Sequence, residues 1–265
     1  MIVQDDVRIE REGEIAVLTM SCVEKRNALS LEMMRRLERA LAALGDDRAV
    51  RVVIVRGEGP AFSAGHDLRE LIRRDVAAYR EIFDACVALM ERIAAIPQPV
   101  IAEVASVATA AGCQLVAACD LAVASSSASF ATPGVRIGLF CSTPMVALSR
   151  AIGRKRAMEM LLTGDPVDAR TACEWGLVNR VVDPEQLHAE TLALARRIAT
   201  ASATVVETGK RAFYTQIEMP QSQAYTYAKD VMIANALDPD AQEGIDAFLK
   251  KRAPRWRGPT GEVES

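Results

Sequence analysis

In the first half of this chain, segments with a strand-like pattern of hydrophobic residues are followed by segments in which such residues recur every three or four positions. Apolar positions on either side of Glu12-Gly13 predict a β-hairpin over 7–20. Apolar residues spaced three or four apart between Ser30 and Leu44 predict a helix capped by Ser30. Short apolar runs predict strands at 52–55, 100–104 and 121–124, with helical segments between them. This order is typical of an α/β protein with a largely parallel sheet.

The second half of the chain is mostly helical in pattern. Gly164 and Gly176 end two short helices, and a short strand follows at 178–182. The remaining predicted helices are 184–200, 203–216, 222–237 and 239–252. We therefore divide the chain into an α/β core over 1–200 and a helical region over 201–265.

Composition excludes several classes of partner. The 265 residues carry a net charge of −3 with a pI near 5.6, so no global basic field attracts nucleic acid or anionic membrane. No apolar stretch reaches membrane-spanning length, and the N-terminus does not resemble a signal peptide. The six cysteines and two histidines form no metal-binding pattern. Reduced, buried thiols favour a cytoplasmic location.

Two segments of small residues carry the candidate chemistry. Ala61–Leu68 and Val107–Leu115 each follow an apolar run and open a helical pattern. Such strand-to-helix turns leave backbone N–H groups free and let a ligand approach closely. Two of them side by side would hold a developing oxyanion, such as the enolate of a thioester.

These segments resemble the two signature turns of the crotonase (enoyl-CoA hydratase/isomerase) superfamily. Further family-like motifs follow in order along almost the whole chain, and the match is closest to the branch called enoyl-CoA hydratase domain-containing protein three. These motifs include Lys25-Arg26-Asn27-Ala28, Leu162-Thr163-Gly164 and Gly176-Leu177-Val178-Asn179. The resemblance implies a ClpP-like spiral of ββα units with a C-terminal all-α trimerisation region, and therefore a homotrimer or a pair of trimers.

The resemblance also implies an acyl-CoA site that needs no other cofactor. It makes the amides of Ala64 and Ala111 the oxyanion hole. The residues that it places against the substrate are Ala64, Gly65, His66, Asp67, Ala111 and Gly134. Those that it places near coenzyme A are Lys25, Arg26, Ala28 and Lys251, of which Lys251 belongs to a second basic cluster near the C-terminus.

The chain departs from the family at its acid–base pair. The two glutamates that activate water in the hydratases fall on Gln114 and Gly134. Neither residue moves a proton near neutral pH, and such groups contribute about 10²–10⁴-fold in rate. Efficient hydration by the usual route is therefore not expected. If the pocket is otherwise intact, restoring both glutamates is expected to install hydration.

Several of these residues have two interpretations. The His66 imidazole either reaches the acyl group or bonds a neighbouring carbonyl. Gln114, one helical turn after Ala111, either faces the same ligand or is a buried, satisfied amide. Asp67 is better explained as a helix cap than as a catalytic carboxylate. Cys113 and Cys141 have no histidine near them in sequence, so we expect core thiols rather than nucleophiles.

Three functions remain open. The first is an enzyme that stabilises a thioester enolate, by hydration or isomerisation with displaced groups, by decarboxylation, or by thioester hydrolysis. The second is a non-catalytic protein that binds acyl-CoA. The third, RNA binding through the Arg35, Arg36 and Arg39 stripe, is disfavoured because Glu32 and Glu38 interrupt it.

Overall fold

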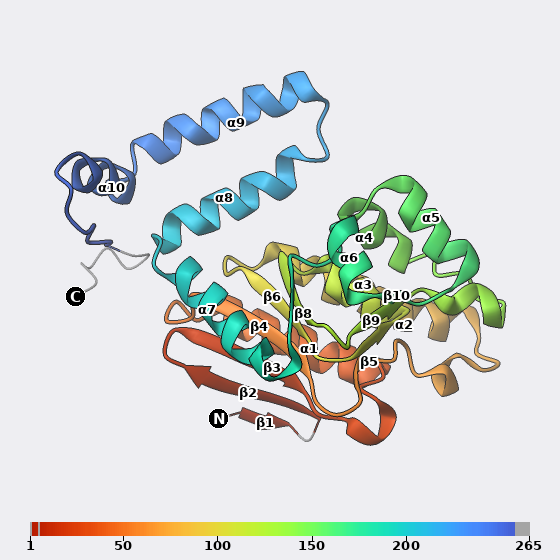
Figure 1. Ribbon diagram of the computed structural model, residues 1–265. Helices are drawn as coiled ribbons and strands as arrows, with labels where there is room; N and C mark the ends of the chain where they lie inside the picture. The colour runs from red at the N-terminus through yellow and green to blue at the C-terminus, as the bar shows by residue number, and fades with distance from the viewer. Residues whose placement is uncertain (1, 5, 258–265) are drawn as a thin grey trace.

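The computed structural model describes residues 2–4 and 6–257, and within them a seven-stranded sheet forms the centre of the molecule (Figure 1). Its first three strands pair antiparallel and the others parallel, which confirms the predicted hairpin and parallel sheet. In spatial order the strands are β1 (Ile2–Gln4), β2 (Val7–Glu12), β3 (Ile15–Met20), β4 (Val52–Gly57), β6 (Val100–Val104), β8 (Leu121–Ser125) and β11 (Arg180–Val182).

A smaller sheet of four short strands was not predicted. Its order is β10 (Val167–Asp168), β9 (Ser129–Ala131), β7 (Val107–Thr109) and β5 (Ala61–Ser63). Strands of two or three residues are too short to show a hydrophobic period, so the sequence assigned two of them to turns. The pairing has a direct consequence for the site, because Ser63 lies in parallel register with Ala108 and joins the two signature segments.

Helices cover both faces of the central sheet because its strands are apolar on both sides. On one face, Val53, Val55 and Ala102 pack against α1 (Leu31–Asp46), α2 (Val76–Ala95) and α3 (Ala111–Ala118). On the other, Ile54 and Ile101 pack against α7 (Leu187–Ala199). The predicted cap of α1 is confirmed, since the Ser30 hydroxyl accepts the Met33 N–H at 3.2 Å.

Short helices occupy several of the connections between the strands and the longer helices. Gly164 and Gly176 end two of them in the left-handed conformation, as predicted. The elements are η1 (Val23–Lys25), η2 (Leu68–Leu71), η3 (Pro133–Ile137), α4 (Pro144–Ala151), α5 (Arg154–Thr163), α6 (Ala169–Trp175) and η4 (Pro184–Gln186).

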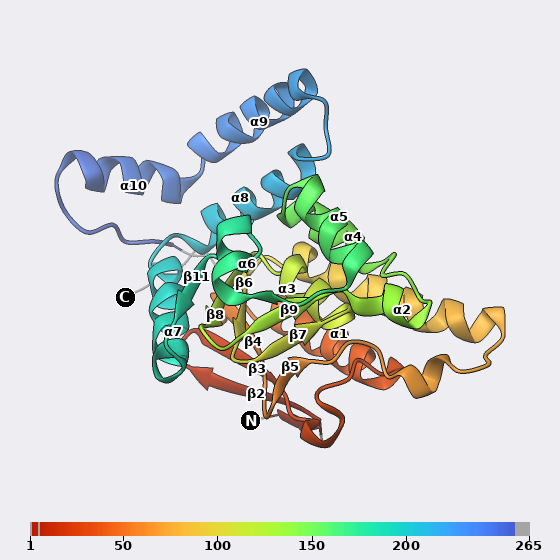
Figure 2. The same cartoon turned by 45° about the vertical axis from the view of Figure 1, so that its right-hand side comes forward.

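The last three helices extend away from the sheet as an arm (Figures 1 and 2). They are α8 (Ala203–Gln216), α9 (Gln221–Ala236) and α10 (Pro239–Leu249), so the division predicted at residue 200 falls between α7 and α8. None of the residues of α9 is buried within the chain. In the described part of the chain, no helix combines the length and apolar character that crossing a membrane requires.

A buried ion pair fixes the base of this arm to the core. The Lys210 ammonium on α8 lies 2.8 Å from the Asp120 carboxylate and donates to the carbonyls of Ile93 and Gln98 at 2.7 and 2.9 Å. The Tyr214 hydroxyl donates to the other Asp120 oxygen at 2.7 Å. Since Asp120 follows α3 directly, the same contacts hold the C-terminal end of that helix.

Candidate functional site

The two signature turns meet in space, as their chemistry requires. A Cβ on Gly65, whose φ is +83°, would lie 2.8 Å from the Ala110 Cβ and 3.2 Å from the Ala111 nitrogen. A Cβ on Gly112 would lie 2.4 Å from the Ser63 carbonyl oxygen. The contacts at 2.8 and 2.4 Å are too short for any side chain, so glycine at these two positions is what lets the turns touch.

Hydrogen bonds from the loop before α1 support the first turn, and three of them involve residues 63–65. The Ser63 hydroxyl donates to the Asn27 carbonyl at 2.8 Å, and the Leu29 N–H donates to the Gly65 carbonyl at 2.7 Å. The Ala64 N–H donates to the Arg26 carbonyl at 3.0 Å. This last bond corrects one expectation: the Ala64 amide already has an acceptor, so it is not free to hold a substrate oxygen.

Two amides beside it remain available. The His66 N–H has no acceptor among the described residues. Ala111 is the first residue of α3, where N–H groups precede the intrahelical bonds and the positive end of the helix dipole lies. Both residues line the same cavity.

That cavity has a volume of about 600 Å³. It lies between the turns, η2, α2 and the segment from η3 to α4. Its lining residues are Ala64, His66, Leu68, Leu71, Phe83, Thr109, Ala110, Ala111, Pro133, Gly134, Arg136, Ile137, Leu139, Phe140, Cys141, Ser142, Thr143 and Pro144. No aspartate or glutamate occurs among these described residues. Sequence reasoning missed part of the apolar wall, because Leu71, Phe83 and Ile137 belong to no motif.

The His66 imidazole bonds a neighbouring carbonyl, the second of the two interpretations. Its Nδ1 lies 3.3 Å from the Leu29 oxygen and donates to it, while its Nε2 is buried without a partner. The Phe83 ring stands edge-on to it at 5.6 Å. Burial lowers the pKa of His66, although the Leu29 carbonyl and Glu70 oppose that shift. The ring is therefore neutral near pH 7.

Gln114 does not face the cavity, which corrects the expectation that it shares a ligand with Ala111. It is buried, and its Oε1 accepts from the Cys86 thiol on α2 at 3.7 Å. Of the two interpretations, the structure supports the buried amide, with one hydrogen bond from Cys86 to its Oε1.

Gly134 does line the cavity, but its position has no room for a glutamate. An added Cβ would lie 2.0 Å from the Leu139 carbonyl oxygen and 2.8 Å from the Cys141 sulfur. The segment after η3 fills the space that a side chain would need. The expectation that Gln114→Glu with Gly134→Glu restores hydration is therefore wrong for this pocket.

The remaining candidates have structural partners. Asp67 does not line the cavity, and its Oδ1 caps η2 by accepting the Arg69 N–H at 3.1 Å. Burial raises the pKa of Cys113 to about 12. Burial also raises the pKa of Cys141, against the opposing effect of a hydrogen bond from the Gly134 amide. Both thiols are protonated at neutral pH, as expected for core cysteines rather than nucleophiles.

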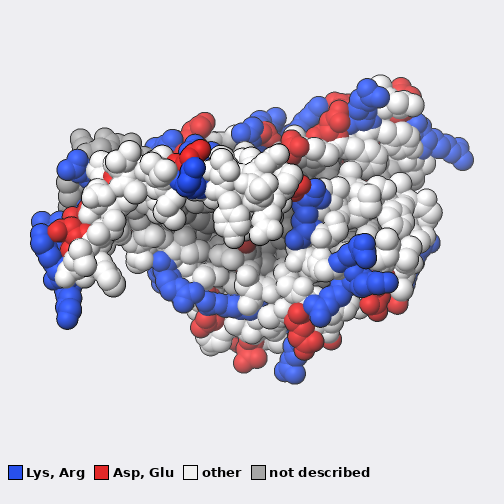
Figure 3. Space-filling model, turned by 90° about the horizontal axis from the view of Figure 1, so that it is seen from above, with Lys and Arg blue, Asp and Glu red and all other residues white. Residues whose placement is uncertain are grey.

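The predicted coenzyme A residues lie in two places. Lys25 and Arg26 are exposed on the loop that supports the first turn, with the partly buried Ala28 beside them. Lys251 follows α10, at the far end of the arm from the cavity (Figure 1). Basic side chains gather at that end, on the left of Figure 3. Within one chain, Lys251 is not brought to the site.

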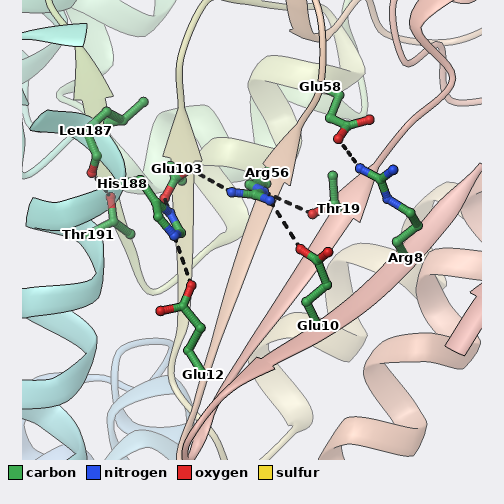
Figure 4. A network of polar contacts seen from close by, with 10 residues as sticks. All are labelled: Arg8, Glu10, Glu12, Thr19, Arg56, Glu58, Glu103, Leu187, His188 and Thr191. Carbon is green, nitrogen blue, oxygen red and sulfur yellow. Dashed lines mark hydrogen bonds and ion pairs between the residues drawn. The ribbon is translucent and has the colours of Figure 1, made fainter. Parts of the chain in front are cut away.

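A second polar cluster lies on the α7 face of the large sheet, away from the cavity (Figure 4). His188 Nδ1 lies 2.8 Å from the Glu103 carboxylate and Nε2 lies 3.0 Å from that of Glu12. Arg56 reaches Glu103 at 3.8 Å and the Thr19 hydroxyl at 3.0 Å. These residues satisfy one another's charges. Among the described residues, no group of His, Cys, Asp or Glu is arranged to hold a metal ion.

Comparison with known proteins agrees with this geometry. The family model described as enoyl-CoA hydratase/isomerase matches residues 10–259. A mouse protein named enoyl-CoA hydratase domain-containing protein 3, mitochondrial, is 48% identical over 93% of this chain and 82% of its own length. The crystal structure of human enoyl-CoA hydratase domain-containing protein 3 is 46% identical, covers 95% of this chain and all of its own, and superposes with a TM-score of 0.92.

A crystal structure named as an enoyl-CoA hydratase of Mycobacterium smegmatis is 45% identical over 96% of this chain and 100% of its own, with a TM-score of 0.93. The names of the vertebrate relatives correct one expectation. The mouse, human and zebrafish proteins, each 48% identical, are all called mitochondrial. The prediction of a cytoplasmic location is therefore wrong; it depended largely on reduced thiols, which do not distinguish one reducing compartment from another.

Family model, sequence identity and superposition agree across nearly the whole chain, so this protein belongs to the enoyl-CoA hydratase/isomerase family and has the crotonase fold.

Proposed function

We propose that the chain binds an acyl-CoA thioester with the carbonyl oxygen between the N–H groups of His66 and Ala111. The observation that carries this proposal is the meeting of the two turns beside the cavity, with these two amides free of other acceptors. Backbone donors held rigidly in this way stabilise the negative charge that develops on a thioester oxygen. The N-terminal end of α3 adds a favourable dipole.

The lining favours an enolate reaction that needs no carboxylate base. Hydration uses two carboxylates to hold and activate water, and no described residue supplies one to the cavity. Decarboxylation makes a smaller demand: the bond from Cα to the carboxylate breaks, CO₂ leaves, and its electron pair passes to the thioester oxygen. A proton from water then reaches Cα. We therefore propose an enolate-forming enzyme, with loss of CO₂ as the reaction that best fits the site.

Coenzyme A itself would leave the cavity beside the loop before α1. Lys25 and Arg26 are exposed there, and each offers a cation to the phosphates. Lys251 joins this set only if a second copy of the chain brings its arm to the site. A non-catalytic acyl-CoA-binding protein is the second candidate, because the same lack of carboxylates that disfavours hydration also suits a protein without chemistry.

The test is turnover and binding of crotonyl-, 3-enoyl-, malonyl-type and aromatic CoA thioesters. We expect binding, little hydration of crotonyl-CoA, and turnover of a malonyl-type thioester. Binding of every thioester with no turnover of any would favour the second candidate.

The pair Ala111→Pro and Ala111→Gly tests the oxyanion hole directly. Proline removes the N–H at a helix position where it is well tolerated, while glycine keeps the N–H. Loss of one such donor costs about 2.7–4 kcal/mol of transition-state stabilisation, or roughly 10²–10³-fold in rate. We expect the proline variant to lose this much and the glycine variant to retain most activity. A folded proline variant with unchanged turnover would contradict the assignment.

A further inference from the structure

The cavity wall is almost free of charge. Its ionisable side chains are the neutral His66, the protonated Cys141 and Arg136. The Arg136 guanidinium is about half exposed and pairs with Asp165, and its Nε donates to the Thr163 carbonyl at 3.0 Å. Since the charge of Arg136 is already paired with Asp165, the lining that a ligand would contact is mainly hydrocarbon.

The apolar lining also continues out to the surface. Four large lining residues are exposed to solvent in the chain, which is unusual for side chains of this kind when they lie together. The exposed fractions are 51% for Leu68, 61% for Ile137, 44% for Leu139 and 38% for Phe140. Leu68 comes from η2, and the other three come from the end of η3 and the segment after it. These four residues, which we call the apolar rim, border the cavity from two elements.

The position of the thioester determines which part of the substrate meets this surface. If its oxygen lies between His66 and Ala111, and coenzyme A leaves beside Lys25 and Arg26, the acyl group contacts the other residues that line the cavity. A two- or four-carbon acyl group would fill only part of a cavity of about 600 Å³. Unfilled space next to apolar walls forfeits contacts that a longer chain makes.

We propose that the acyl group taken by this site is a long hydrocarbon chain with an uncharged end, and that the apolar rim contacts its distal carbons. This inference rests on the proposed function. It also selects against a carboxylate at the distal end of the acyl chain, as distinct from the Cα carboxylate that decarboxylation removes, because a distal carboxylate would meet hydrocarbon or an arginine already paired with Asp165.

Binding of a series of saturated thioesters tests the proposal. Calorimetry would compare acetyl-, butyryl-, octanoyl- and dodecanoyl-CoA, with glutaryl-CoA as the charged probe. Each methylene that becomes buried is expected to strengthen binding by about four-fold, until the chain passes the rim. Glutaryl-CoA is expected to bind more weakly than butyryl-CoA, although its chain is longer.

A matched pair of variants locates the effect. Ile137→Asn places an amide on the rim, and Leu162→Asn makes the same kind of change at an equally exposed residue outside the cavity, 60% against 61%. We expect Ile137→Asn to weaken dodecanoyl-CoA binding at least ten-fold more than it weakens acetyl-CoA binding. Leu162→Asn should change neither. Light scattering in parallel would report whether either change alters assembly.

The outcomes separate this inference from the proposed function. Equal affinities for acetyl- and dodecanoyl-CoA, or tighter binding of glutaryl-CoA than of butyryl-CoA, would overturn the long-chain proposal and leave acyl-CoA binding standing. An Ile137→Asn variant that changes assembly but not the dependence on chain length would show that the rim contacts another copy of the chain. No binding of any thioester would overturn the proposed function as well.

Discussion

Ala110 has an uncommon backbone conformation at the point where the two turns meet. It precedes α3 with φ 52° and ψ −119°, a region that residues with a Cβ rarely adopt. Such a residue costs of order 1–3 kcal/mol, which the surrounding structure must offset. Its N–H donates to the Ala131 carbonyl at 2.8 Å, so the smaller sheet helps hold it in place.

Replacing this residue with glycine should therefore stabilise the chain. We expect Ala110→Gly to raise the free energy of unfolding by about 1 kcal/mol, since glycine adopts positive φ without strain and loses only part of that gain to backbone entropy. Ala117→Gly, inside α3, is the control and should lower it by about 1 kcal/mol. Urea unfolding of both variants gives the comparison. Similar losses in the two would show that Ala110 is not strained.

At the scale of single residues, the sequence indicated where glycine permits a close approach better than it indicated which hydrogen bonds form. The small residues of the signature turns correctly indicated a close approach, and Gly65 and Gly112 make it. It was harder to identify which backbone N–H is free to bind a substrate oxygen. The Ala64 N–H donates to the carbonyl of Arg26, which is distant in sequence. The direction of Gln114 likewise depends on Cys86, which lies on another helix. No local pattern contains either partner.

At the scale of elements, His188 ties α7 to two strands of the large sheet. Its ring lies between the carboxylates of Glu12 on β2 and Glu103 on β6 (Figure 4). Burial alone would lower the pKa of His188, but the hydrogen bonds that its ring donates to both carboxylates outweigh burial and raise the pKa above its ordinary 6.5. The ring can donate to both carboxylates at once only while it stays protonated, because neutral imidazole has a single N–H.

This shift predicts how stability depends on pH. A raised pKa in the folded state means that the contribution of His188 is complete below pH 6.5 and is lost as the pH rises through the raised value. The group is partly exposed, so the loss should stay within about 1 kcal/mol. Urea unfolding from pH 5.5 to 8.5, at one protein concentration, should show this decline in the parent and not in His188→Gln.

His66, the other histidine of the sequence, provides the control. Its pKa is lowered by burial, so its contribution has the opposite sign and is lost as the pH falls below 6.5. His66→Gln should leave the decline at higher pH intact. A parent protein whose stability rises steadily from pH 6.5 to 8.5, with no difference in His188→Gln, would contradict the assigned role.

Elements were predictable where they were long and periodic. The helix after Ser30 and the buried strands follow from hydrophobic spacing alone, and the structure confirms them. The short strands β5, β7 and β9 were not predicted, because they exist through pairing with one another rather than through their own sequence. The cluster around His188 gave no signal either, since its members come from four separate segments: the β2–β3 hairpin, β4, β6 and α7.

At the scale of the whole molecule, the arm is the part that a single chain leaves incomplete. Large apolar side chains on α8, α9 and α10 are exposed. Helix α9, which extends away from the sheet (Figures 1 and 2), buries none of its residues. Exposed fractions reach 69% at Met232, 79% at Leu237 and 83% at Phe248. A soluble protein seldom leaves such surface open unless another chain covers it. Assembly would also be the only way for Lys251 to reach a site.

We therefore expect the chain to form a trimer or a pair of trimers, with the arm at the contact. Light scattering at micromolar concentration should give a mass three or six times that of the chain. Phe248→Lys, which places a charge on the most exposed apolar residue of α10, should shift the mass towards monomer. Leu162→Lys, on α5 and 60% exposed, is the matched control and should leave assembly unchanged.

If assembly supplies Lys251 to a neighbouring site, the Phe248→Lys variant should also bind coenzyme A more weakly. A stable monomer at these concentrations would contradict the expectation and leave the apolar arm available to a different partner.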